Sequence, residues 1–173
     1  MTTVTAVRLD VPDFDNEYHT ITVDTIGQSS ANAFTVYLNT PLRNVVQARL
    51  LGARIKTLHS TEHCYISIDE LDSNFADRAT KDPPLSISSQ PGLSVLRNSF
   101  ASIVSETAAT SGDQVISFKD NYMVAQQFLD PLAKLDRLTI RIRDEDGNTI
   151  KNPSSAGNNF LVLRFVCKKS NLK

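Results

Sequence analysis

Residues 137–143 read RLTIRIR and show the period-two alternation of a β-strand more clearly than any other part of the chain. Leucine and isoleucine occupy the even positions, and arginine and threonine occupy the odd ones, so one face of the strand is apolar and the other is polar. The next residues, DEDGN at 144–148, are turn formers, and Gly147 can adopt a positive φ. This stretch predicts a half-buried strand that ends in a turn.

The same alternation recurs throughout the chain, whereas apolar residues spaced three or four apart are scarce. We predict further strands at residues 20–26, 33–38, 45–58, 63–71, 100–104, 114–118 and 160–167. Residues 121–128 fit a helical turn or two, and a strand nearly as well. The pattern predicts an all-β fold, with a single jelly-roll sandwich of two antiparallel sheets, about eight strands and little helix as the leading topology.

Two prolines are predicted to end secondary-structure elements. Pro41 closes the strand predicted at 33–38, because it cannot donate a backbone hydrogen bond and holds the preceding residue in an extended conformation. Pro131 stops the segment at 121–128. The two prolines lie in similar segments, LNTPL at 38–42 and LDPL at 129–132, and each segment precedes a long alternating strand. This similarity is a weak indication of a two-fold plan.

The strand predicted at residues 45–58 changes the parity of its apolar positions near Gly52. One extra residue there explains the change as a β-bulge, and a bend at the bulge would let one strand serve both sheets. The positions predicted to face the core are Val46, Ala48 and Leu50 before the change, and Leu51, Ala53 and Ile55 after it.

Length and charge limit the classes of protein that fit. A chain of 173 residues suits one core, and we predict an N-terminal arm at 1–19 followed by a single jelly-roll domain at 20–173. The formal net charge of -1 provides no field for holding a phosphate backbone, so we expect no direct nucleic-acid partner.

No run approaches the ~18 apolar residues of a membrane helix, so we expect no membrane span and a soluble protein. Cys64 and Cys167 are expected to be buried thiols.

Motifs of catalytic chemistry are not found in the sequence. It lacks G-x-S-x-G, H-E-x-x-H, a Walker loop and G-x-G-x-x-G. His59, His63 and Cys64 could hold zinc on a helix, but we interpret them as a turn between strands. The segment 144–148 resembles a calcium loop only superficially, because its glycine comes one position too early. We therefore expect no enzyme activity, no cofactor and no metal.

Two groups of residues are candidates for contacts with a protein neighbour. The arm at 1–19 carries aromatic side chains that could tie it to another subunit, although it could equally add an edge strand. Outward arginines from position 137 onward, with lysines after the last strand, could form a basic stripe that suits an acidic protein surface. The candidate assembly contacts are Phe14, Tyr18, Arg141, Arg143, Lys168 and Lys169.

Three stretches carry a resemblance to a known family. They are FTVYLNTPLRNVVQARLLGARI at 34–55, LDRLTIRIRDEDGNTI at 135–150 and NFLVLRFVCKK at 159–169. The chain resembles the single-jelly-roll capsid proteins of large double-stranded DNA viruses and virophages. The resemblance implies a virion protein made in the host cytoplasm: either the penton, a homo-pentamer at the capsid vertex, or a minor capsid protein that cements the major capsid protein. It assigns no functional role to an individual residue.

Two other functions remain open from the sequence. A host-attachment module on the same sandwich could use the long polar loop predicted at 72–93 to bind a receptor. An enzyme on a cupin-like barrel would need a histidine-rich metal set, and His19, His59 and His63 lack that spacing.

Overall fold

The computed structural model describes residues 15–58, 60–71, 99–105, 112–150 and 158–169, and within them it is all-β, as predicted. The strands are β1 (Asn16–Asp24), β2 (Ala33–Leu58), β3 (His63–Ile68), β4 (Ala101–Val104), β5 (Asp113–Phe118), β6 (Val124–Arg143) and β7 (Phe160–Lys168). A single 3-10 turn, η1 (Asp69–Leu71), follows β3. No helix in this part of the chain is long and apolar enough to cross a membrane.

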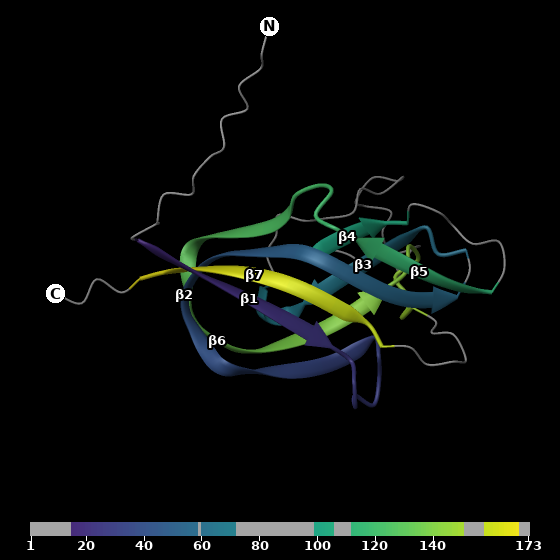
Figure 1. Cartoon of the computed structure of the whole chain (residues 1–173), viewed down its shortest axis with the longest axis horizontal. Coiled ribbons are helices and arrows are strands. Elements are labelled where there is room, and N and C mark those ends of the chain that lie inside the picture. Colours follow the sequence, from purple (N-terminus) through teal and green to yellow (C-terminus); the bar gives the residue numbers. More distant parts are fainter. Residues whose placement is uncertain (1–14, 59, 72–98, 106–111, 151–157, 170–173) are drawn as a thin grey trace, which may run out of the picture.

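The strands form one continuous antiparallel sheet in the order β1-β7-β2-β6-β3-β4, and β5 also pairs with β2 (Figure 1). β2 and β6 pair with each other over three stretches. Residues 33–37 of β2 pair with 137–141 of β6, residues 42–45 pair with 132–135, and residues 47–50 pair with 124–127. Because both strands bend between the first and the last of these stretches, the sheet curls and its two halves face each other.

The curl produces two layers around one core. The first layer, here called the β7 layer, contains β1, β7, the second part of β2, the first part of β6 and β5. The second, the β3 layer, contains the first part of β2, the second part of β6, β3 and β4. One hydrophobic cluster joins Leu50 and Phe165 of the β7 layer to Ile66 and Leu138 of the β3 layer, and all four side chains are fully buried. The sandwich is therefore a single sheet folded over.

The predictions that Pro41 closes a strand and that Pro131 stops the segment at 121–128 are wrong, because β2 and β6 each continue through their proline. Both prolines lie at the bend. The β2–β6 ladder has no pairs at residues 38–41 of β2 or at residues 128–131 of β6. A proline removes one N–H donor, and at these positions the ladder uses none. The segment 121–128 is a strand from Val124 onward, not a helical turn.

The predicted bulge at Gly52 is confirmed by a register shift between Leu50 and Gly52 in the β2–β7 ladder. A second shift, between Val45 and Gln47, was not expected, and it turns Val45 into the core while Val46 is only half-buried. The bend that lets β2 serve both layers comes earlier than Gly52, at 38–42. Leu51, predicted to face the core, is also half-buried.

The predicted arm overlaps the sheet at its end. Asn16 to His19 already belong to β1, which is the first strand of the sheet order and thus an edge strand. Residues 1–14, with Phe14, lie outside the described residues, as do His59 and the loop predicted at 72–93. The predicted turn at 144–148 is confirmed, with Gly147 at a φ of 82°.

A buried asparagine ties together the end of the sandwich opposite the bend. The Asn159 side chain accepts a hydrogen bond from the backbone N–H of Lys56 (2.9 Å) and donates to the carbonyl of Ala31 (2.9 Å) and to Asn32 Oδ1 (3.0 Å). Its backbone N–H donates to Thr25 Oγ1 at 2.9 Å. The β1–β2 connection is thereby fastened to β2 and to the start of β7.

We predict that Asn159→Ala lowers the free energy of unfolding by roughly 2–3 kcal/mol, because buried backbone groups would lose their partners. Urea unfolding followed by circular dichroism measures this loss. Asn121→Ala, at an exposed position, is the matched control and should change stability by less than about 0.5 kcal/mol. Equal stability of the two variants would contradict the role given to Asn159.

Candidate assembly site at the open side of the sandwich

The two sides of the sandwich, where its layers end, differ in how they are closed. On the β4–β5 side, Gln114 Nε2 of β5 donates to Ser105 Oγ, just after β4, at 2.8 Å. Tyr122 Oη donates to the carbonyl of Ser102 in β4 at 2.9 Å. Side chains therefore bridge the two layers on this side.

The opposite side is open. β1 forms the edge of the β7 layer, and residues 33–40 at the start of β2 form the edge of the β3 layer. Within the described residues, no strand pairs with the outer edge of either segment. A hollow of about 630 Å³ lies between them. We call this hollow and its rims the open side.

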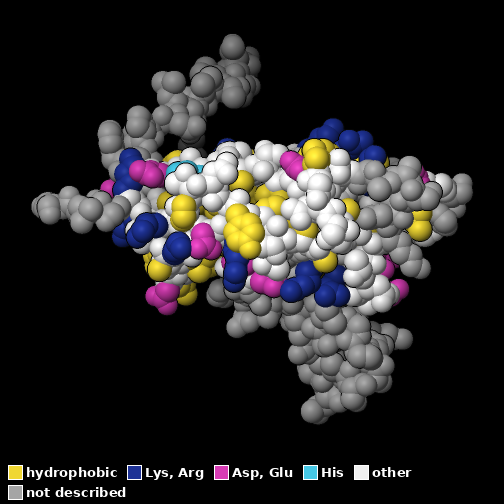
Figure 2. Space-filling model, turned by 90° about the horizontal axis from the view of Figure 1, so that it is seen from below, with side chains coloured by type: hydrophobic (Ala, Val, Ile, Leu, Met, Phe, Trp, Pro, Cys, Tyr) yellow, Lys and Arg dark blue, Asp and Glu magenta, His cyan; other side chains and the backbone are white. Residues whose placement is uncertain are grey.

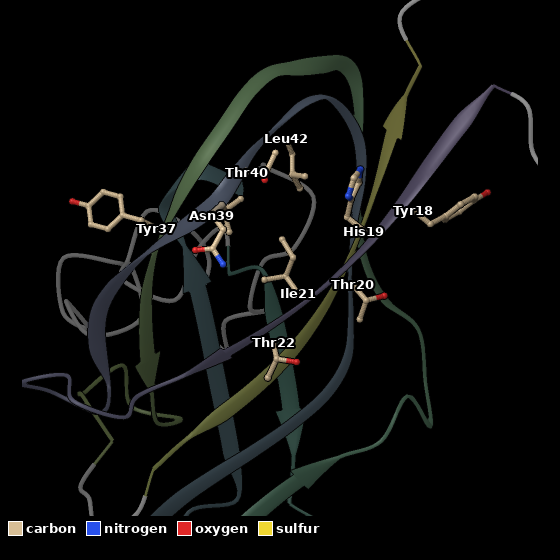
Figure 3. A pocket seen from close by; sticks show the side chains of 10 residues that line it. Tyr18, His19, Thr20, Ile21, Thr22, Tyr37, Asn39, Thr40 and Leu42 are labelled. Carbon is tan, nitrogen blue, oxygen red and sulfur yellow. The ribbon is translucent and has the colours of Figure 1, made fainter.

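Residues 18–22 of β1, with 37–40 and Leu42 of β2, line the hollow (Figure 3). Ile21 of β1 and Leu42 of β2 point into it, and both pack on the hydrophobic core. Tyr18 and Tyr37 point outward on its two sides, with 57% and 75% of their surfaces exposed. Because large exposed aromatic side chains are typical anchors of protein interfaces, these rims suit contact with another chain.

A second, smaller hollow of about 270 Å³ adjoins the first at the bend and shares His19, Thr40 and Leu42 with it. Three basic residues, Arg43, Lys168 and Lys169, and one acidic residue, Glu17, line it. The open side therefore has a few apolar side chains among polar ones along β1, and it is basic toward the bend.

The structure brings together three of the predicted contact residues. Tyr18 lines the larger hollow, and Lys168 and Lys169 line the smaller one. Arg141 and Arg143 are in the β3 layer, where β6 pairs with β3. The predicted contacts thus fall into two separate groups.

The predicted basic stripe is interrupted by acidic partners, because β6 places its outward arginines beside the turn η1. Arg141 forms an ion pair with Asp69, and Arg137 Nε lies 3.3 Å from Glu70 Oε1. Arg143 donates to the carbonyl of Gly147 at 2.9 Å. Lys and Arg side chains lie among acidic and hydrophobic ones on the face shown in Figure 2.

Sequence reasoning missed Tyr37 and Arg43. The alternation in residues 33–38 already placed Tyr37 outward, between the half-buried Val36 and Leu38. What the local pattern did not contain was the position of this segment at a sheet edge, which depends on pairing with β6 over 100 residues away.

The residues considered as metal ligands have other roles. Asp144 Oδ1 accepts the backbone N–H groups of Asp146 (3.1 Å) and Asn148 (2.8 Å), as in a hairpin turn. His63 stacks on Tyr65 with ring centroids 6.1 Å apart. Among the described residues, no three His, Cys, Asp or Glu side chains gather as a metal site.

Both cysteines are buried thiols, as predicted, but only one lies at the open side. Burial, followed by the nearby charges of Glu145 and Asp144, raises the pKa of Cys64. Cys167 lines the smaller hollow, and burial together with the charge of Glu17 raises its pKa as well. Both thiols are therefore protonated at neutral pH.

We predict that N-ethylmaleimide modifies Cys167 before Cys64, because Cys167 lines the smaller hollow whereas Cys64 is fully buried. Since the pKa of Cys167 is raised above its ordinary value of 9.0, the rate should still increase as the pH rises past that value. Mass spectrometry of digested samples measures both rates, and Cys167→Ser should remove the faster phase. Modification of Cys64 first would contradict the arrangement.

Comparison of the sequence with protein-family models and with curated proteins finds no match.

Proposed function

We propose that this chain is a structural subunit of a viral capsid, namely the penton protein, of which five copies close a vertex. The observation that carries the proposal is the open side, where two strand edges, a long hollow and two exposed tyrosines form a surface suited to a protein neighbour. The stretches that resemble single-jelly-roll capsid proteins support it, because they include the bend of β2 and the strands of both layers.

A ring of identical subunits needs a heterologous contact, in which one surface meets a different surface of the next copy. Among the described residues, one side of the sandwich is open and the β4–β5 side is bridged, so the two sides differ as a heterologous contact requires. The opposite flank is bridged by Gln114 and Tyr122 and presents a different surface. The open side of one subunit can therefore meet another face of its neighbour, and the rotation can close after five copies.

The charge distribution supports protein partners at short range. The net charge of -1 gives no strong long-range repulsion between copies. The basic residues of the smaller hollow offer a local match for acidic side chains on a neighbour. Other copies of the chain and the major capsid protein are the partners that we propose.

The native mass of the purified chain tests the proposal directly. Light scattering coupled to size exclusion, across protein concentration and salt, should give five times the mass of the chain. A monomer at every concentration would contradict the vertex ring. A cement protein that binds only the assembled capsid would then be the remaining structural role.

We predict that Tyr37→Ser raises the concentration needed for half-maximal assembly by about tenfold or more, because truncating an aromatic anchor removes about 2 kcal/mol of contact energy. Ile26→Ser is the matched control: Ile26 is also apolar and 62% exposed, but it lies in the turn after β1, at the end of the sandwich opposite the bend, and lines neither hollow. Neither change should alter the unfolding of the subunit. An equal effect of both variants would contradict assembly through the open side.

A further inference from the structure

The larger hollow has the form of a groove for one extended strand. Residues 18–22 of β1 run along it, and five extended residues span about 16 Å. Among the described strands, only β7 pairs with β1, so a strand could be added on the other edge of β1. Ile21 and Leu42 offer apolar contacts inside the hollow for alternate side chains of such a strand.

A segment of this chain with a matching pattern precedes β1. Residues 3–11 read TVTAVRLDV and contain neither glycine nor proline. Val7, Leu9 and Val11 would share one face, with charged residues between them on the other. Nine extended residues span about 30 Å, which is longer than the part of β1 that borders the hollow.

Charge favours one direction for this segment in the groove. A strand antiparallel to β1 would place its later residues at the bend, beside Arg43, Lys168 and Lys169. The later residues of the segment include Asp10, and Asp13 follows shortly after it. The acidic residues would thus lie near the basic end of the open side.

The connection to β1 favours the groove of another copy over the groove of the same copy. The carbonyl of Asp15 accepts the N–H of Lys169 at 2.8 Å, which continues the β1–β7 ladder past Asn16. Because Asp15 still belongs to the ladder, folding back would require a three-residue hairpin loop at residues 12–14, which read PDF. Such a loop places its last residue in the left-handed conformation, and a bulky residue such as Phe14 disfavours that conformation.

We infer that residues 3–11 of one copy lie in the hollow between β1 and β2 of the next copy, antiparallel to β1, with Val7, Leu9 and Val11 facing inward. This inference rests on the proposed function, because it describes how neighbouring subunits of the ring are tied together. Each subunit then donates one strand and accepts one, so the contact is heterologous and can close into a ring.

Crosslinking of mixed samples tests the exchange. Unlabelled chains and chains labelled with heavy nitrogen are dissociated, reassembled together and treated with a carbodiimide, which joins carboxylates to amines without a spacer. We expect crosslinks from Asp10 to Lys168 or Lys169, with mixed-label pairs as abundant as same-label pairs. Same-label crosslinks alone would show that the segment folds onto its own chain, and no such crosslinks would show that it lies elsewhere; either result overturns the inference.

A pair of double variants adds a second measurement. Val7→Ser with Leu9→Ser removes the inward apolar face and should raise the concentration for half-maximal assembly by about tenfold or more. The control, Ala6→Ser with Arg8→Gln, changes the outward face and should shift it by less than about twofold. A pentamer that is indifferent to the first variant would overturn the strand exchange and leave the proposed function standing, whereas a monomeric native chain would contradict the proposed function itself.

Discussion

β2 and β6 must bend together, because they pair with each other before, within and after the bend. An antiparallel sheet with one apolar face is stable only when that face is covered, and this sheet covers it with its own other half. If either strand ended at its proline, the ladder on the far side of the bend would lose its central pair. The layers, the core and the open side all depend on this shared bend.

The bend also determines where the molecule is open. It carries β2 from the edge of the β3 layer into the middle of the β7 layer, where β7 covers its outer edge. At the start of β2, no described strand pairs with the same edge, and this unpaired edge lies opposite β1. On the other flank, Gln114 and Tyr122 join the layers. One flank is therefore closed by side-chain hydrogen bonds, and the other presents the surface that we propose for assembly.

Predictions that depend on neighbouring residues were confirmed, whereas predictions that depend on a distant partner strand failed. The alternation in RLTIRIR, the turn at Gly147 and the bulge at Gly52 are properties of neighbouring residues, and all three predictions were confirmed. The predictions for Pro41 and Pro131 failed, because a proline breaks a ladder only where a partner strand needs its N–H. Which residues have such a partner is decided by the bend and not by the local sequence.

For the candidate site, the sequence showed which residues have side chains suited to a protein contact. It did not show which of them lie close together in the fold. Tyr18, Lys168 and Lys169 could be identified as candidate contact residues, whereas Tyr37 and Arg43 gained their importance from the edge on which they lie. The outward arginines of β6 were expected to be available, but Asp69 and Glu70 pair with two of them from a turn about 70 residues away. The sequence by itself determined the all-β class and most strand faces, because side-chain alternation is local. Tertiary structure alone decided which edges remain open and which charges are paired, because both depend on contacts between residues far apart in the chain.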